Sequence, residues 1–201
     1  MRFTGKVFRY LRHPRLFFVN QFKKSRICRY RMLSDARKVR GRPVCIQPVL
    51  LKGPGYIEFG ERVRFGIEDS AGFFSSYSLV NARTEVSRIV FGHEITINNQ
   101  FSAVAEGGGI FIGDRTIIGL NVSIMDTDFH NIDPEERMSP LYPTSAVRIG
   151  RNVWIGNNVT ILKGTIIGDN SVIAAHSLVN SEIPAGSLAG GTPCRVIRPI
   201  P

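Results

Sequence analysis

The 201-residue sequence contains few cysteines, and its N-terminal segment has no long hydrophobic run. Cys28, Cys45 and Cys194 form no CxxC pair, and an odd number of cysteines does not suggest a disulfide framework. The longest purely apolar run of the N-terminal segment is residues 16–19, which is too short for a membrane-spanning helix or the core of a signal peptide. We therefore expect a protein of the reduced cytoplasm.

The sequence also lacks the common motifs of covalent and metal-dependent catalysis. It has no GxSxG segment and no cysteine with an obvious base partner, so a covalent acyl-enzyme is not expected. A triple glycine at residues 107–109 is followed neither by Lys-Ser/Thr nor by a helix, which favours a loop over a phosphate cradle. No two histidines stand at the helix or hairpin spacing of zinc ligands; the four are His13, His93, His130 and His176.

Negative charge is almost absent from the N-terminal arm, residues 1–45. Residues 1–42 hold fourteen of the 26 Lys and Arg residues but only one acid, Asp35. Phenylalanines and other bulky apolar residues are mixed with the basic ones, and we expect two or three short helices broken near Pro14. Residues 1–40 could then contact an anionic membrane surface. The alternative is a plain cap on the next domain; no motif accompanies the charge that would predict nucleic-acid binding.

The most regular stretch is residues 147–183, which consists of six consecutive hexads. Neither the helical nor the strand period explains a step of six residues, which is typical of a parallel β-helix. There, one hexad forms one side of a triangular coil and three hexads complete a turn, so residues eighteen apart stack in the core. Burying each such side chain is worth roughly 1.5–3 kcal/mol. The branched aliphatic residues at the third position of each hexad are Ile149, Ile155, Ile161, Ile167, Ile173 and Val179.

The same step recurs with interruptions in the preceding part of the chain. It is weak over residues 57–65, absent over residues 67–88 and regular again over residues 91–124. Glycines commonly follow the core positions, as at Gly150 and Gly168. We expect these glycines at the corners of the coil, with a positive φ.

Residues 125–146 interrupt the hexads with a polar segment that contains three prolines, and we expect it to leave the coil as a projecting loop. Loops on rigid scaffolds often carry function. This loop contains the run Asp126-Thr-Asp128-Phe-His130. A histidine oriented by a carboxylate is the usual side chain for removing a proton from a hydroxyl near neutral pH. His130 is therefore the candidate general base, with Asp126 or Asp128 as the orienting group.

The single tryptophan, Trp154, directly precedes the core position Ile155. Because side chains alternate along a strand, Trp154 should face outward. An outward tryptophan on a β-helix face is expected at an interface or in a ligand groove.

The hexads, the run VWIGNNVTILKGTIIGDNSVIAAHSLV and the closing IPAGSLAGGTPCRVIRPI resemble the hexapeptide-repeat acyltransferases, especially the galactoside/maltose acetyltransferases and the polysaccharide O-acetyltransferases. The resemblance covers roughly residues 55–200. It implies an all-β, left-handed parallel β-helix and a homotrimer whose acetyl-CoA and acceptor sites lie in clefts between subunits. In this family the loop histidine deprotonates the acceptor hydroxyl, which attacks the thioester directly, and His130 matches that position.

The same resemblance implies roles for further residues. Asn98 matches an asparagine that positions the acceptor, and Trp154 matches the outward tryptophan that lines the cleft near the thioester. The pantetheine arm of acetyl-CoA runs along the later coils, and a basic pair lies near the nucleotide phosphates. The matching residues are Asn157, Ala175 and Asn180 along the arm, and Arg195 and Arg198 at the phosphates.

The loop departs from the sugar acetyltransferases, which usually have Gly-His-Pro where this chain has Asp-Phe-His-Asn with one extra residue. Aspartate-rich versions look more like the polysaccharide O-acetyltransferases. We therefore predict a CoA-dependent O-acetyltransferase that acts on a sugar hydroxyl of a cell-surface polysaccharide or its precursor. The β-helix domain would span residues 46–200, and the basic arm would hold it at the inner membrane face.

Three alternatives remain open. The first is the same fold with an amino sugar or an antibiotic-like acceptor. The second is a zinc carbonic-anhydrase-like β-helix that uses His93, His130 and His176 across a trimer boundary. The third is a non-catalytic β-helix scaffold, although a passive scaffold needs no projecting loop.

Overall fold

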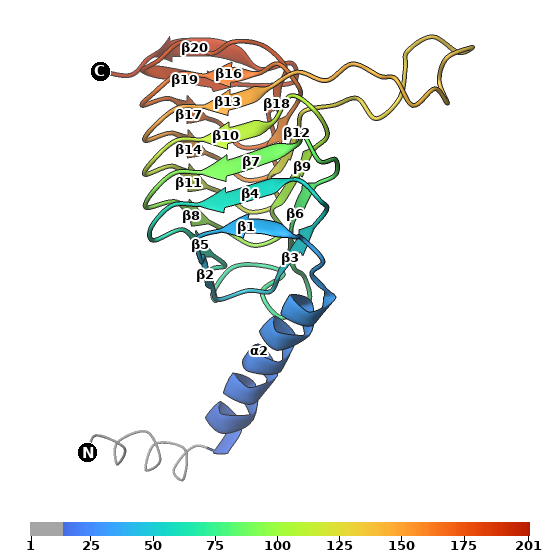
Figure 1. The fold of residues 1–201 in the computed structure, drawn as a ribbon. Helices are drawn as coiled ribbons and strands as arrows, with labels where there is room; N and C mark the ends of the chain where they lie inside the picture. Colours follow the sequence, from blue (N-terminus) through green and yellow to red (C-terminus); the bar gives the residue numbers. More distant parts are fainter. Residues whose placement is uncertain (1–13) are drawn as a thin grey trace.

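The computed structural model describes residues 14–201, and the predictions for residues 1–13 lie outside this range. One helix, α2 (Pro14–Leu33), is followed by a left-handed parallel β-helix (Figure 1). Pro14 stands at the start of α2, where a missing backbone N–H costs nothing and the fixed φ suits the helix. The described part of the arm contains this one helix, which begins at the predicted break near Pro14.

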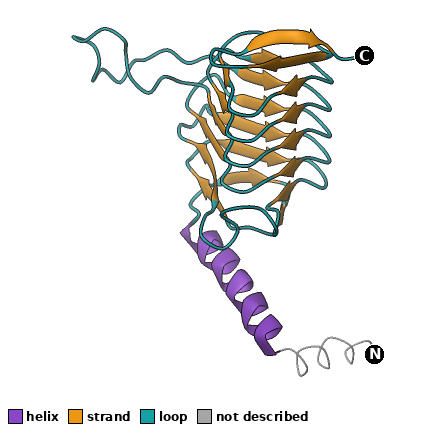
Figure 2. Ribbon diagram, turned by 180° about the vertical axis from the view of Figure 1, so that it is seen from behind, coloured by secondary structure: helices purple, strands orange, loops and turns teal. Residues whose placement is uncertain are grey.

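Three sheets form the sides of the β-helix, and each successive coil adds one parallel strand to each sheet (Figure 2). The first sheet contains β1 (Lys38–Arg40), β4 (Tyr56–Phe59), β7 (Arg88–Phe91), β10 (Ile110–Ile112), β13 (Val147–Ile149) and β16 (Ile166–Ile167). The second contains β2 (Val44–Cys45), β5 (Arg64–Phe65), β8 (Thr96–Ile97), β11 (Ile117–Ile118), β14 (Trp154–Ile155), β17 (Val172–Ile173), β19 (Ser187–Gly190) and the antiparallel β20 (Arg195–Pro199). The third contains β3 (Val49–Lys52), β6 (Ser78–Ala82), β9 (Ser102–Ala105), β12 (Ser123–Met125), β15 (Thr160–Ile161) and β18 (Leu178–Val179).

The predicted core positions of the hexads are confirmed. All six side chains are buried, and residues eighteen apart are strand partners, as Ile149 is with Ile167. Ile112 pairs directly with Ile149, although the projecting loop lies between them in the sequence. The apolar core therefore runs without a break past the point where the loop leaves.

Gly150, Gly156 and Gly168 do not have the positive φ that was expected for them. The left-handed conformation occurs two residues later, at Asn152 (φ 55°) and Asn170 (φ 60°), whose side chains hydrogen-bond to each other at 2.8 Å. Gly150 is required for a different reason: a Cβ there would lie 2.7 Å from the backbone nitrogen of Asp169 in the next coil. Asparagine tolerates the left-handed region, so glycine is left for the point of closest approach between coils.

Strand pairing begins earlier than residue 46, where the sequence analysis starts the β-helix domain. β1 pairs with β4, and β2 pairs with β5. The first coil lacks a regular hexad and is joined to the second through backbone hydrogen bonds such as Val44 N–H to Val63 O, at 2.8 Å. Backbone pairing of this kind leaves no trace in a side-chain pattern.

The C-terminal half of α2 lies against the open end of the β-helix. Arg26 donates a hydrogen bond of 2.6 Å to the Phe73 carbonyl, and the Tyr30 ring lies 4.8 Å from that of Tyr77. The N-terminal half extends away from the β-helix (Figure 1), and no side chain of α2 is buried. Among the described residues, no helix has the length and hydropathy of a membrane span.

The predicted loop projects from the β-helix between β12 and β13 (Figures 1 and 2). A single antiparallel bridge between Thr127 and Thr144 joins its two arms at the base, and a hydrogen bond of 2.8 Å from Ser145 N–H to Asp126 O lies beside it. The loop is therefore anchored where it leaves the coil and exposed beyond that point.

Candidate active site

His130 is exposed on the outgoing arm of the projecting loop. Its Nδ1 lies 3.1 Å from the backbone carbonyl of Arg137, on the other side of the loop tip. A carbonyl oxygen can only accept a hydrogen bond, so Nδ1 carries the proton. In the neutral ring, Nε2 then has the lone pair, which is the form that a general base requires.

Neither aspartate of the loop orients His130 in this structure. Asp126 is completely buried, and its carboxylate accepts hydrogen bonds from the backbone N–H groups of Glu106 (2.7 Å), Gly107 (3.2 Å) and Gly109 (2.6 Å). Asp128 forms an ion pair of 2.9 Å with Lys163. Asp126 instead fixes the triple-glycine turn to the base of the loop, and the group that contacts the His130 ring is the Arg137 carbonyl.

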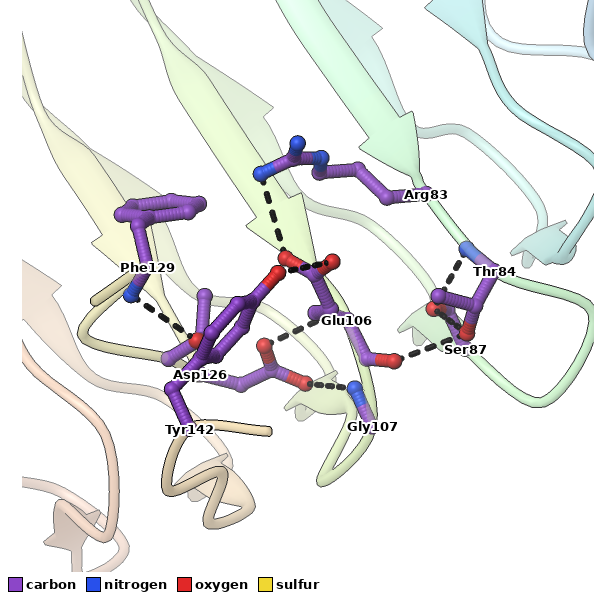
Figure 3. Close-up of polar contacts among 9 residues, drawn as sticks. Arg83, Thr84, Ser87, Glu106, Gly107, Asp126, Phe129 and Tyr142 are labelled. Carbon is purple, nitrogen blue, oxygen red and sulfur yellow. Dashed lines mark hydrogen bonds and ion pairs between the residues drawn. The ribbon is translucent and has the colours of Figure 1, made fainter. Parts of the chain in front are cut away.

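A second polar cluster at the loop base combines Arg83, Glu106, Phe129 and Tyr142 (Figure 3). The Tyr142 hydroxyl donates a hydrogen bond of 2.5 Å to one Glu106 oxygen, and Arg83 lies 3.1 Å from the other. The Arg83 guanidinium also lies over the Phe129 ring, 5.3 Å from its centroid. No pattern in the sequence indicates this cluster, because its members come from three separate segments and none occupies a core position of a hexad.

Trp154 faces outward as predicted, with 57% of its surface exposed. It lies on β14 in register with Ile117 on β11 and Val172 on β17, and Val172 is in turn in register with Leu188 on β19. These four side chains form an outward apolar strip along the second sheet. An exposed strip of this kind is suited to a cofactor arm or to a second protein surface.

Three of the other predicted residues follow strands of the second sheet, at the corner that leads to the third. Asn98 follows β8, and Asn157 follows β14 with its side-chain oxygen 2.8 Å from the Leu120 N–H. Ala175 follows β17 and is exposed. Asn180 is exposed too but lies at the next corner, after β18, on the side from which the loop leaves.

Arg195 and Arg198 lie exposed on β20, at the end of the β-helix farthest from α2 (Figure 1). Their guanidinium groups donate hydrogen bonds to neighbouring backbone carbonyls, of Cys194 at 2.8 Å and of Pro199 at 3.1 Å. Among the salt bridges of residues 14–201, none involves either arginine. Both guanidinium groups can therefore bind an anion without first losing an acidic partner.

The predicted site residues form two groups on different sides of the β-helix. His130 and Asn180 lie on the side of β12 and β18, whereas Trp154 lies on the side of β11, β14 and β17 (Figure 1). One protomer therefore presents each half of the predicted site without bringing the two halves together.

His93 and His176 lie at different corners of the coil. His93 lies at the corner between β7 and β8, where its Nδ1 accepts a hydrogen bond of 3.1 Å from the Glu61 N–H. His176 lies after β17 and has a positive φ of 59°. Within the described part of the chain, no group of three or more His, Cys, Asp or Glu residues converges as metal ligands would.

Comparison with known proteins supports the inference from the hexads. Residues 146–181 match the family model of the bacterial transferase hexapeptide, six repeats. The chain is 31% identical over 194 residues to YJL218W of Saccharomyces cerevisiae, a provisionally named acetyltransferase, and the match covers 93% of this chain and 85% of the yeast protein. The chain belongs to the hexapeptide-repeat acetyltransferases.

Two proteins of Escherichia coli are similar over shorter stretches. WbbJ of Escherichia coli, provisionally named a lipopolysaccharide biosynthesis O-acetyl transferase, is 31% identical over 159 residues, which is 75% of this chain and 76% of WbbJ. The galactoside O-acetyltransferase of Escherichia coli is 40% identical over 115 residues, which is 55% of this chain and 56% of that enzyme.

Proposed function

We propose that this protein transfers the acetyl group of acetyl-CoA to a sugar hydroxyl of a cell-surface polysaccharide or its precursor. The observation that carries the proposal is the hydrogen bond between His130 Nδ1 and the Arg137 carbonyl, which in the neutral ring leaves the Nε2 lone pair available on an exposed loop. His130 Nε2 removes the hydroxyl proton as the sugar oxygen attacks the thioester carbon. The carbon–sulfur bond then breaks, and the CoA thiolate leaves with the proton that the imidazolium returns.

The exposed residues of the later coils fit the two ends of acetyl-CoA. Arg195 and Arg198 have the charge for its phosphates. The apolar strip around Trp154 and the polar corner at Asn157 and Ala175 match its mixed pantetheine arm. CoA is in this way assigned to the C-terminal coils, away from α2.

We further propose that the complete site forms between copies of the chain in a homotrimer. The support is the separation of His130 and Trp154 onto different sides of one protomer. A second copy that packs against the loop side would bring its own Trp154 strip toward His130. It would also cover apolar surface that one protomer leaves exposed.

A polysaccharide acceptor is supported by two features. WbbJ is named for lipopolysaccharide biosynthesis, and the match covers three quarters of its length. The aspartate-rich loop also departs from that of the sugar acetyltransferases. A panel of polysaccharide, amino-sugar and free-sugar acceptors, with thiol release as the readout, distinguishes the acceptor classes.

The role of His130 is tested by replacing it with alanine. His130→Ala should lower kcat by roughly 10²–10⁴-fold, the usual contribution of a general base, without changing the thermal stability or the oligomer. His93→Ala is the matched control, because His93 is also exposed but lies on a different corner of the coil. Wild-type turnover by His130→Ala would overturn the mechanism. Loss of the wild-type protein's activity on addition of a chelator would favour the zinc alternative.

We also propose that the arm contacts an anionic membrane. Helix α2 contains six Lys or Arg residues and no acid, its N-terminal half extends into solvent, and Phe18 is 69% exposed. Deleting residues 1–33 should abolish sedimentation with phosphatidylglycerol vesicles at low salt, and vesicles of phosphatidylcholine are the control. Equal sedimentation with and without the arm would leave α2 as a cap on the β-helix.

A further inference from the structure

We propose that Arg83, Glu106 and Tyr142 act as positioning residues that hold the projecting loop so that His130 faces its substrate. The inference rests on the proposed function of His130 as the general base. It goes further, because these residues belong neither to the predicted site nor to the hexads. The three are called the loop clamp below.

The loop clamp contacts both the outgoing and the returning segment of the projecting loop. Glu106 follows β9 in the body of the β-helix, and its carboxylate binds Tyr142 on the returning arm. Arg83 follows β6, binds the same carboxylate and covers the ring of Phe129 on the outgoing arm. Phe129 directly precedes His130, so the clamp fixes the chain one residue before the proposed base.

Backbone strain at Phe129 supports a positioning role. Phe129 has φ 63°, a left-handed conformation that costs a residue with a side chain about 1–2 kcal/mol. The other described non-glycine residues with positive φ all lie at corners of the coil, where the repeat imposes that conformation. A strained backbone conformation of this kind persists only where contacts with surrounding residues hold it in place. Here Arg83 holds the ring, and the Phe129 N–H donates a hydrogen bond of 3.1 Å to Thr127 Oγ1.

The clamp depends on all three members. The Glu106 side chain is only 14% exposed, so its carboxylate has little access to water and needs both partners. Removal of Tyr142 releases the returning arm, and removal of Glu106 leaves Arg83 and Tyr142 without their common acceptor. Because Arg137, whose carbonyl binds His130, lies between the two clamped arms, movement of either arm disturbs the base.

The clamp can be tested through the kinetics of acetyl transfer. Tyr142→Phe and Glu106→Gln should lower kcat by about 10–100-fold while the KM for acetyl-CoA stays within about twofold, since the loss is one of orientation. Arg83→Lys, which keeps the charge, should retain more activity than Arg83→Met. Ile132→Ala is the control, because Ile132 lies on the same loop, is 86% exposed and belongs to no part of the clamp.

Trypsin provides a readout that does not depend on activity. Arg137 is the only Lys or Arg in residues 126–146, so cleavage of the Arg137–Met138 bond reports how tightly the loop is held. Tyr142→Phe and Glu106→Gln should be cut several times faster there than the wild type and Ile132→Ala, at unchanged thermal stability of the β-helix.

Faster cleavage together with the fall in kcat supports the inference. Unchanged cleavage in both variants shows that the clamp does not hold the loop, and faster cleavage with an unchanged kcat shows that it holds the loop without positioning His130. Either result overturns the inference. A wild-type protein that transfers no acetyl group to any acceptor contradicts the proposed function itself, and the trypsin rates still show separately whether the loop is clamped.

Discussion

At the scale of single residues, Asp126 has the largest structural role in the loop. Its buried carboxylate accepts three backbone N–H groups from residues 106–109. Asp126→Ala leaves these donors without an acceptor, and we expect it to lower the free energy of unfolding by about 2–3 kcal/mol. Asp128→Ala, which removes one partly exposed ion pair with Lys163, should cost less than about 1 kcal/mol. Chemical denaturation of the two variants measures both values, and equal stability of Asp126→Ala and wild type would refute the structural role.

The phenol of Tyr142 makes the loop clamp dependent on pH. Its hydrogen bond to the Glu106 carboxylate, with some desolvation, raises the Tyr142 pKa above its ordinary value. A group whose pKa is raised by folding stabilises the folded form fully below its unfolded pKa, here about 10, and loses that effect as the pH rises through the folded pKa. The clamp should therefore hold at neutral pH and release in alkali.

An absorbance titration of tyrosinate tests this expectation. The difference between wild type and Tyr142→Phe should show one phenol that ionises above the ordinary tyrosine pKa of about 10. A difference curve centred at that ordinary value would mean that Tyr142 is not bound to a carboxylate in solution.

At the scale of structural elements, the close approach of successive coils decides where glycine is needed. A Cβ on Gly156 would lie 2.6 Å from the backbone nitrogen of Ala175, and backbone cannot move aside as a flexible side chain can. The equivalent position one coil later is Ala174, which is accommodated because Gly190 lies opposite it. Gly156→Ala should thus destabilise the protein by about 1–3 kcal/mol, measured as a lower Tm. An unchanged Tm would show that the coils can separate without cost.

The sequence predicts some of these elements well and others poorly, for physical reasons. Each regular hexad buries its own apolar residue, as Ile155 does, so the regular coils and the projecting loop are visible in the pattern. The first coil is joined through its backbone, and the loop clamp depends on side chains brought together from distant segments; neither has a periodic signal. The exposed loop position of His130 and the outward face of Trp154 could be predicted, but the group that hydrogen-bonds to His130 Nδ1 is a backbone carbonyl, which every residue has.

At the scale of the whole molecule, the basic helix α2 and the proposed catalytic loop lie apart. Basic α2 lies at one end of the β-helix, while the projecting loop and the exposed arginines of β20 lie at the other (Figure 1). This arrangement lets the arm approach an acidic surface while the proposed cofactor site stays open to solvent. It also makes Arg195 a suitable position at which to test cofactor binding, since a substitution there changes neither the projecting loop nor the N-terminal arm.

Titration calorimetry with acetyl-CoA, on the wild type and Arg195→Ala, is therefore the measurement to make first. Arg42→Ala is the control, because Arg42 is also exposed but lies in the first coil, between β1 and β2. We predict saturable binding in the micromolar range, about tenfold weaker in Arg195→Ala after loss of one charge-assisted contact and unchanged in Arg42→Ala. No binding by the wild type at millimolar acetyl-CoA would contradict an acetyl-CoA-dependent transferase.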